Sequence, residues 1–147
     1  MPAKRLAVDA WEALFRAQVA IFRDINAEFP NELLTIVEYD LLFNLSRLSG
    51  RTARPRDLNS VLLLSQPSIS RLIDRMAERG FVTKTPDPED GRGILVTLTE
   101  DGFRMFRKVA AVHSESIARR FGDSLDEDEL RTLIELCDRI RRAAPAP

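Results

Sequence analysis

Residues 64–82 read LSQPSISRLIDRMAERGFV and carry the clearest structural signal in the sequence. Ser65 is a favourable N-cap for a helix, and Gly80 is a favourable C-terminal stop. Between them, apolar residues recur at three- and four-residue spacing, which places them on one helical face: Ile69, Leu72, Ile73 and Met76. The stretch therefore predicts an amphipathic helix over residues 66–79.

The opposite face of this helix carries short polar and basic side chains. Such side chains suit a recognition helix, because base edges in the major groove are reached mostly from its N-terminal turns and small residues let the backbone approach closely. The candidate DNA-contacting residues are Gln66, Ser68, Ser70, Arg71 and Arg75. The alternative is a solvated helix whose two arginines pair with Asp74 and Glu78.

The neighbouring segments favour a winged helix-turn-helix. A short helix over residues 56–62 comes first, and only Leu63, Leu64 and Ser65 separate it from the next, so the chain must turn sharply. Residues 81–84 and 94–98 then predict two strands of a hairpin, joined by a long exposed turn over residues 86–93.

The hairpin carries a candidate contact to the minor groove. Arg92 lies between two glycines, and we expect Asp90 to hold its guanidinium in position. A narrow minor groove concentrates negative potential and attracts an inserted arginine. Lys84, on the first strand, is a further DNA-contacting candidate. The alternative is a surface loop with an ordinary Asp–Arg pair, but its occurrence beside a helical turn favours DNA binding.

Two helices are predicted before the central module. The first covers residues 9–29 and ends at Pro30, and its apolar residues recur at helical spacing. The second begins at Thr35, which forms a capping box with Glu38, and runs to about residue 48. Residues 49–55 then predict a loop.

Two more helices follow the hairpin. Thr99 caps a helix that runs to residue 121, where Gly122 ends it. Asp126 and Glu129 form the capping box of the last helix, which carries Cys137 on its apolar stripe, so we expect that thiol to pack in a core. Residues 143–147 predict a disordered tail.

The terminal helices carry wide apolar stripes that the small central module cannot cover. The economical way to bury such stripes is against a second copy of the chain. We therefore expect a two-fold homodimer.

Composition limits the function to a few classes. The 147 residues, 44% of them apolar, support one packed domain. One histidine, one cysteine and no glycine-rich phosphate loop exclude a zinc site and make an enzyme a poor fit. No run approaches the roughly 20 apolar residues of a membrane span, and no signal peptide is evident. We expect a cytoplasmic protein without cofactor, metal or membrane partner.

Charge is distributed unevenly along the chain. The net charge is −1, yet residues 47–92 hold nine basic and six acidic side chains, an excess of +3. Residues 1–46 carry a net −3. The basic part coincides with the helical turn and the hairpin, which modestly favours a polyanionic partner there.

The chain resembles the MarR (multiple antibiotic resistance regulator) family. The resemblance rests on residues 64–82 and on residues 86–102, which read PDPEDGRGILVTLTEDG. Within the second run, Asp90, Arg92 and the later Leu98, Thr99 and Gly102 form a specific combination. Outer matches are Trp11 and residues 38–40, whereas Asn59 and Leu63 depart from the family's usual small residue and glycine.

The resemblance implies a fold and a function. The fold is mainly α with a β-hairpin wing, in one domain over residues 1–147, with a DNA-binding lobe over 35–98 and dimerisation helices over 6–30 and 99–142. The function is sequence-specific binding of a pseudo-palindromic operator by a repressor that a small aromatic or phenolic effector releases. Candidate pocket residues are Trp11, Phe15, Gln18, Tyr39, Phe43 and His113. The alternative function is a winged-helix module for protein assembly, against which the presence of both Arg71 and Arg92 speaks.

Overall fold

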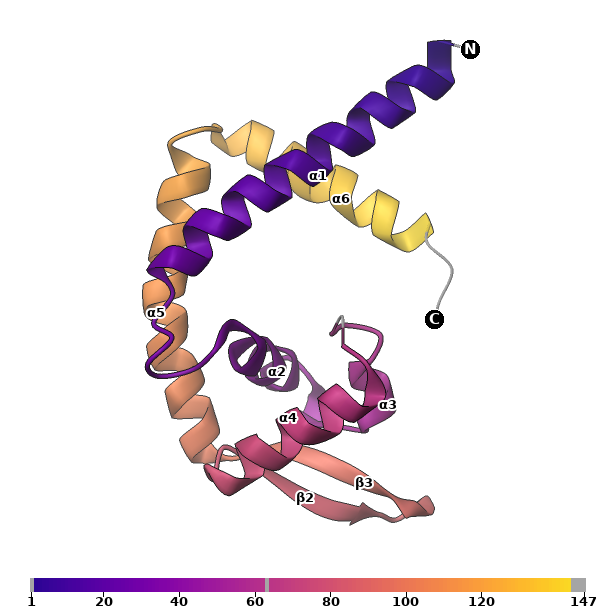
Figure 1. Cartoon of the computed structure of the whole chain (residues 1–147), viewed down its shortest axis with the longest axis vertical. Helices are drawn as coiled ribbons and strands as arrows, with labels where there is room; N and C mark the ends of the chain where they lie inside the picture. Colours follow the sequence, from indigo (N-terminus) through magenta and orange to yellow (C-terminus); the bar gives the residue numbers. More distant parts are fainter. Residues whose placement is uncertain (1, 63, 144–147) are drawn as a thin grey trace.

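The computed structural model describes residues 2–62 and 64–143, without the side chains of Pro2 and Gln66. The helices are α1 (Pro2–Glu28), α2 (Ile36–Ser46), the 3-10 turn η1 (Ser49–Arg51), α3 (Pro55–Leu58), α4 (Gln66–Glu78), α5 (Glu100–Gly122) and α6 (Glu127–Ala143). The strands are β1 (Thr52–Ala53), β2 (Val82–Asp87) and β3 (Asp90–Leu98). Figure 1 shows α2, α3, α4 and the hairpin gathered at one end, while α5 leads from them to α1 and α6.

The core lies under the apolar face of α4. The four residues that the sequence places on this face are at most 1% exposed. They pack in one cluster with α2 and the sheet, which includes Leu41, Leu42, Leu45, Val82, Val96 and Leu98. The predicted fold class, mainly α with a β-hairpin wing, is confirmed.

Caps position α4 and α5. The Ser65 Oγ accepts a hydrogen bond from the backbone N–H of Ser68 at 3.4 Å, and the Thr99 Oγ1 accepts one from Gly102 at 3.0 Å. Gly80 ends α4 with a φ of +79°, a conformation that favours glycine. Because this turn is so short, β2 begins directly beside the helix.

The capping box at Thr35 forms only in part. The backbone N–H of Glu38 donates to the Thr35 Oγ1 at 3.2 Å, as predicted. The Glu38 carboxylate does not return the bond; it accepts from the Arg79 Nη1 at 2.6 Å. A buried carboxylate gains more from an arginine than from a backbone amide, so this ion pair joins α2 to the end of α4.

Helix bounds differ from the predictions in two places. The first helix begins at Pro2 rather than at residue 9, because the intervening residues are helix formers and proline is tolerated in a first turn. The helix expected over 56–62 is reduced to α3, where the Ser60 hydroxyl donates to the carbonyl of Asp57 at 2.7 Å and competes with the helical bonds. Leu63, in the predicted turn, and the tail after residue 143 lie outside the described residues.

The sheet is larger than predicted. Its order is β1-β3-β2, all antiparallel, and β1 arises within the expected loop over 49–55 because Thr52 and Thr97 pair and join their hydroxyls at 2.8 Å. The hairpin turn is short instead of long, since β2 and β3 remain paired up to Asp87 and Asp90. The register shifts between Pro86 and Asp87.

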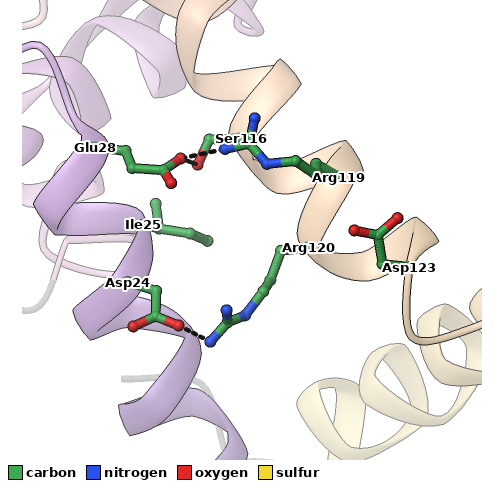
Figure 2. Close-up of a pocket in the computed structure, with 7 residues that line it drawn as sticks. All are labelled: Asp24, Ile25, Glu28, Ser116, Arg119, Arg120 and Asp123. Atoms are coloured by element: carbon green, nitrogen blue, oxygen red, sulfur yellow. Dashed lines mark hydrogen bonds and ion pairs between the residues drawn. The ribbon is translucent and has the colours of Figure 1, made fainter.

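The C-terminal half of α1 packs against α5. Figure 2 shows Glu28 of α1 directed at Ser116 and Arg119 of α5. The Glu28 Oε2 accepts hydrogen bonds from the Ser116 Oγ and from the Arg119 Nη2, each at 2.6 Å. Asp24 and Arg120 form a second ion pair beside the buried Ile25. These contacts fix the direction in which α1 leaves the rest of the chain (Figure 1).

Elsewhere the terminal helices expose their apolar faces. Trp11 on α1 is 60% exposed and Ile134 on α6 is 63% exposed. Other exposed apolar residues of these two helices are Leu6, Phe15, Phe22, Leu136 and Ile140. The expectation that Cys137 packs in a core is wrong within this single chain, where the residue is exposed. The stripe on α6 that carries it is largely exposed, as at Ile134 and Ile140. None of the helices over residues 2–62 and 64–143 has both the length and the apolar character to cross a membrane.

We expect Gly102→Ala to lower the free energy of unfolding by roughly 1–3 kcal/mol. A Cβ at this position would lie 2.1 Å from the carbonyl oxygen of Phe81, so the base of the hairpin would have to move away from α5. Urea denaturation followed by circular dichroism measures the change.

Gly122→Ala is the matched control in the same helix, because nothing lies within 4 Å of the place that its new methyl group would take. It should leave the unfolding free energy unchanged or raise it by up to about 1 kcal/mol. Equal effects of the two substitutions would contradict the close approach at Gly102.

Candidate nucleic-acid interface

The outer face of α4 presents Ser70, Arg71 and Arg75 to solvent. Ser68 is half-buried, and its Oγ accepts hydrogen bonds from the Ser65 Oγ at 2.9 Å and from the Arg71 Nη2 at 3.2 Å. These bonds orient Arg71 along the first turns of the helix. Of Gln66 only the backbone is described, so the position of its side chain lies outside the described residues.

Three arginines of this region carry free charge. Over residues 2–62 and 64–143, no ion pair involves the guanidinium groups of Arg71, Arg75 or Arg92. The alternative in which Asp74 neutralises an arginine of α4 fails, because Asp74 accepts from the Nζ of Lys84 at 2.5 Å. Lys84 thus links β2 to α4 and has part of its charge neutralised.

The wing presents Arg92 differently from the prediction. Arg92 is exposed on β3, but the Asp90 Oδ1 accepts from the backbone N–H of Arg92 at 3.1 Å, not from its guanidinium. A short aspartate side chain reaches the backbone N–H two residues later more readily than it reaches the distant guanidinium of an arginine side chain. Asp90 therefore fixes the strand and leaves the guanidinium of Arg92 free.

A cleft of about 280 Å³ lies between α4 and the wing. Its walls come from the start of α3, from α4 and from the hairpin, and include Arg54, Arg56, Ser70, Asp87, Asp90 and Arg92. Side chains from α4 and from β3 thus border one continuous surface. A duplex that contacted Arg71 would lie close to this wing.

Two arginines that charge alone would nominate for DNA contact are engaged within the protein. Arg79 holds Glu38 and also donates to the backbone carbonyl of Leu33 at 2.7 Å. Arg54 forms ion pairs with Asp87 and Glu89 of the hairpin. Sequence patterns missed both roles, because each partner lies more than 30 residues away in the chain. The acidic residues Asp87 and Glu89 in the hairpin turn were a signal that the turn could bind a basic side chain.

Among the candidate pocket residues, Tyr39, Phe43 and His113 lie together between α2 and α5. The rings of Tyr39 and His113 meet edge to face at 5.0 Å, and those of Tyr39 and Phe43 stack at 6.3 Å. Burial lowers the pKa of His113, so its imidazole is neutral at pH 7. The buried Nδ1 of His113 has no hydrogen-bond partner among the described residues.

Two clefts border this aromatic cluster. One, of about 440 Å³, has a mostly apolar wall in which Asp40 is the charged residue, with Tyr39 and His113 beside it. The other, of about 530 Å³, is lined by aromatic rings and by Arg107. Trp11, Phe15 and Gln18 lie on the exposed part of α1 and border neither cleft within this chain.

Comparison with known proteins relates this geometry to one family. The model of the MarR family matches residues 34–93. The multiple antibiotic resistance protein MarR of Salmonella typhimurium is 30% identical over 86 residues, which are 58% of this chain and 60% of that protein. The chain thus matches less than two thirds of that relative's length.

Solved structures extend the likeness to nearly the whole chain. AbsC, a MarR family transcriptional regulator from Streptomyces coelicolor, is 29% identical with a TM-score of 0.78, and the match covers 90% of both chains. Sco3205 from the same organism, solved in complex with DNA, shares the fold with a TM-score of 0.79 at 20% identity, over 94% of this chain and 92% of that one. With its capped helix α4, short-turned wing and flanking long helices, the chain is similar in sequence and in fold to members of the MarR family.

Proposed function

We propose that the chain binds operator DNA as a two-fold homodimer and represses transcription until a small aromatic effector releases it. One observation carries the proposal: Arg71, Arg75 and Arg92 extend free charge from two adjacent elements that border one cleft. Unpaired arginines are what a helix in the major groove and a wing in the minor groove require.

In this proposal, the residues of α4 contact the major groove of the duplex and the wing contacts the minor groove. Arg71, with Ser68 and Ser70 beside it, is placed to reach base edges from the first turns of α4. Arg75 lies one turn later and is suited to the phosphate backbone. Arg92 on the wing is suited to the minor groove, and Lys84 could join only by giving up Asp74. Residues 35–98 form the DNA-binding lobe in this proposal.

The dimer is proposed from the terminal helices, residues 6–30 and 99–142. Their exposed apolar side chains gather on α1 and α6, at the opposite end of the molecule from the wing (Figure 1). A second copy that covers these faces leaves both recognition helices free. The two half-sites of a pseudo-palindromic operator would then lie about one helical turn apart.

The effector is proposed to be a small aromatic or phenolic anion in the larger cleft. Arg107 on its rim attracts an anion, and the rings of Tyr39, Phe43 and Phe106 offer stacking surfaces. The other cleft suits an anion less, because Asp40 would repel it. Both clefts are lined by residues of α2 and α5, so a bound molecule would bias the angle between the DNA-binding lobe and α5.

We expect the protein to be a dimer in solution and Ile134→Asp to shift it toward monomer. The substitution places a charge in the proposed interface, where it would be buried without a partner. Val61→Asp is the control, because Val61 is similarly exposed at 54% but lies in the DNA-binding lobe. Multi-angle light scattering gives the mass; a monomeric wild-type protein at micromolar concentration would remove the two-fold arrangement.

Arg71→Ala and Arg92→Ala should weaken DNA binding in different ways. If Arg71 reads a base edge, its loss costs roughly 1–3 kcal/mol on the operator and relaxes preference at one position per half-site. If Arg92 enters the minor groove, its loss matters most with A·T-rich flanks and reduces the salt dependence of binding.

The measurement is a salt titration of each variant on operators with exchanged flanks, taken first from the promoter nearest the protein's own gene. Arg131→Ala removes an exposed arginine that pairs with Glu127 outside the DNA-binding lobe; it serves as the control and should bind like the wild type. Should neither Arg71→Ala nor Arg92→Ala change affinity, the module would serve protein assembly rather than DNA recognition.

An aromatic anion such as 4-hydroxybenzoate should reduce operator affinity, and Arg107→Gln should weaken that response. Asp40→Asn is the comparison, because it removes a charge from the other cleft and should preserve or strengthen the response. Calorimetric titration of both variants measures effector binding directly. A response that Asp40→Asn abolishes and Arg107→Gln leaves intact would place the effector in the smaller cleft.

A further inference from the structure

Arg54, which immediately precedes α3, bonds to the turn of the wing. Its Nε donates to the Asp87 Oδ2 at 2.5 Å, and its Nη2 donates to the Asp87 Oδ1 at 3.3 Å and to the Glu89 Oε2 at 2.8 Å. Two of its guanidinium nitrogens are thereby engaged with carboxylates. Arg54 is thus committed to the hairpin and is a poor candidate for a phosphate contact.

Asp87 is the buried member of this group. Its side chain is only 2% exposed, although it lies at the end of a strand in a hairpin turn. Besides Arg54, it accepts a hydrogen bond from the backbone N–H of Glu89 at 3.0 Å, which closes the turn. Asp87 also stands where the register of β2 and β3 shifts, so its side chain supplies order where the ladder is irregular.

The pair joins parts of the chain that are 33 residues apart. One end belongs to the helix-turn-helix and the other to the wing. The hydrogen bonds from Arg54 and from the Glu89 backbone hold the pKa of Asp87 below its usual range, so the carboxylate stays charged. A buried carboxylate that loses its arginine must find water, and opening the end of the hairpin is the way to admit it.

We propose that Arg54 and Asp87 are positioning residues, which hold the wing at a fixed angle to α4 so that Arg92 and Arg71 reach the same duplex. Both members of the pair, together with Ser70 and Arg92, border the cleft between α4 and the wing. The proposal rests on the proposed function, because it assigns the pair a role in DNA binding. Neither residue needs to touch DNA.

Arg54 forms two ion pairs, and the proposal predicts that removing one or the other changes DNA affinity in opposite directions. Asp87→Asn and Glu89→Gln each remove one negative charge from the wing, which by electrostatics alone strengthens binding to a polyanion. Glu89 is 80% exposed and holds no other described part of the fold, so Glu89→Gln should bind DNA as tightly as the wild type or more tightly. Asp87→Asn should instead bind about tenfold more weakly, because the buried ion pair is lost.

The first experiment measures hydrogen exchange in the free protein. Backbone amides of residues 85–95 should exchange faster in Asp87→Asn than in Glu89→Gln or the wild type, while those of α2 and α4 keep their protection. The exchanged pair Arg54→Asp with Asp87→Arg should restore protection in part. Unchanged exchange in the wing, or an equal loss of protection throughout the lobe, would overturn a positioning role.

The second experiment measures operator affinity in a double-mutant cycle of Asp87→Asn with Arg92→Ala. If the pair acts through Arg92, then Arg92→Ala costs less in the Asp87→Asn background than in the wild type. Full additivity, or Asp87→Asn binding as tightly as Glu89→Gln, would contradict the proposal. Failure of the proposed function looks different: the wild-type protein would bind none of the duplexes, while the exchange experiment would still report whether the pair holds the wing.

Discussion

Helix α4 buries one face completely, and this constraint determines what its other face can do. Ile69, Leu72 and Met76 are held in the core against α2 and the sheet. At 100° per residue, their burial forces Arg71 and Arg75 outward. Gly80 then allows the chain to reverse at once, so that the wing begins beside α4 rather than elsewhere on the lobe. The basic surface is therefore a consequence of how the core is packed.

Local signals made much of this arrangement predictable. Ser65, Thr99 and Asp126 cap helices through bonds that span only three residues, and such short-range geometry is readable from sequence. The apolar periodicity of α4 likewise reports its buried face directly. Arg71 and Arg92 could be singled out because they lie on elements whose type and direction these signals define.

Several of the missed features depend on contacts between residues that are distant in sequence. Strand β1 forms because Thr52 pairs with Thr97 of β3, and no pattern within residues 49–55 predicts a strand. The turn predicted over residues 86–93 is shorter than expected, since β2 and β3 stay paired up to Asp87 and Asp90. At its end, Asp87 accepts a hydrogen bond from Arg54, which lies just before α3. Cys137 lies on a true apolar stripe, but a stripe does not specify whether its partner is the same chain or another.

Internal pairing also reconciles a net charge of −1 with a surface suited to DNA. Carboxylates are common in the lobe, yet three of them are directed at basic groups within the fold: Glu38 at Arg79, Asp74 at Lys84 and Asp87 at Arg54. In these pairs the opposite charges neutralise each other, and the pairs also hold α2, β2 and the wing against their neighbours. The arginines on the outer face of α4 and on β3, Arg71, Arg75 and Arg92, form no ion pair with any described residue. The potential that a duplex would meet thus depends on where the fold leaves charges unpaired, which a count along the sequence does not show.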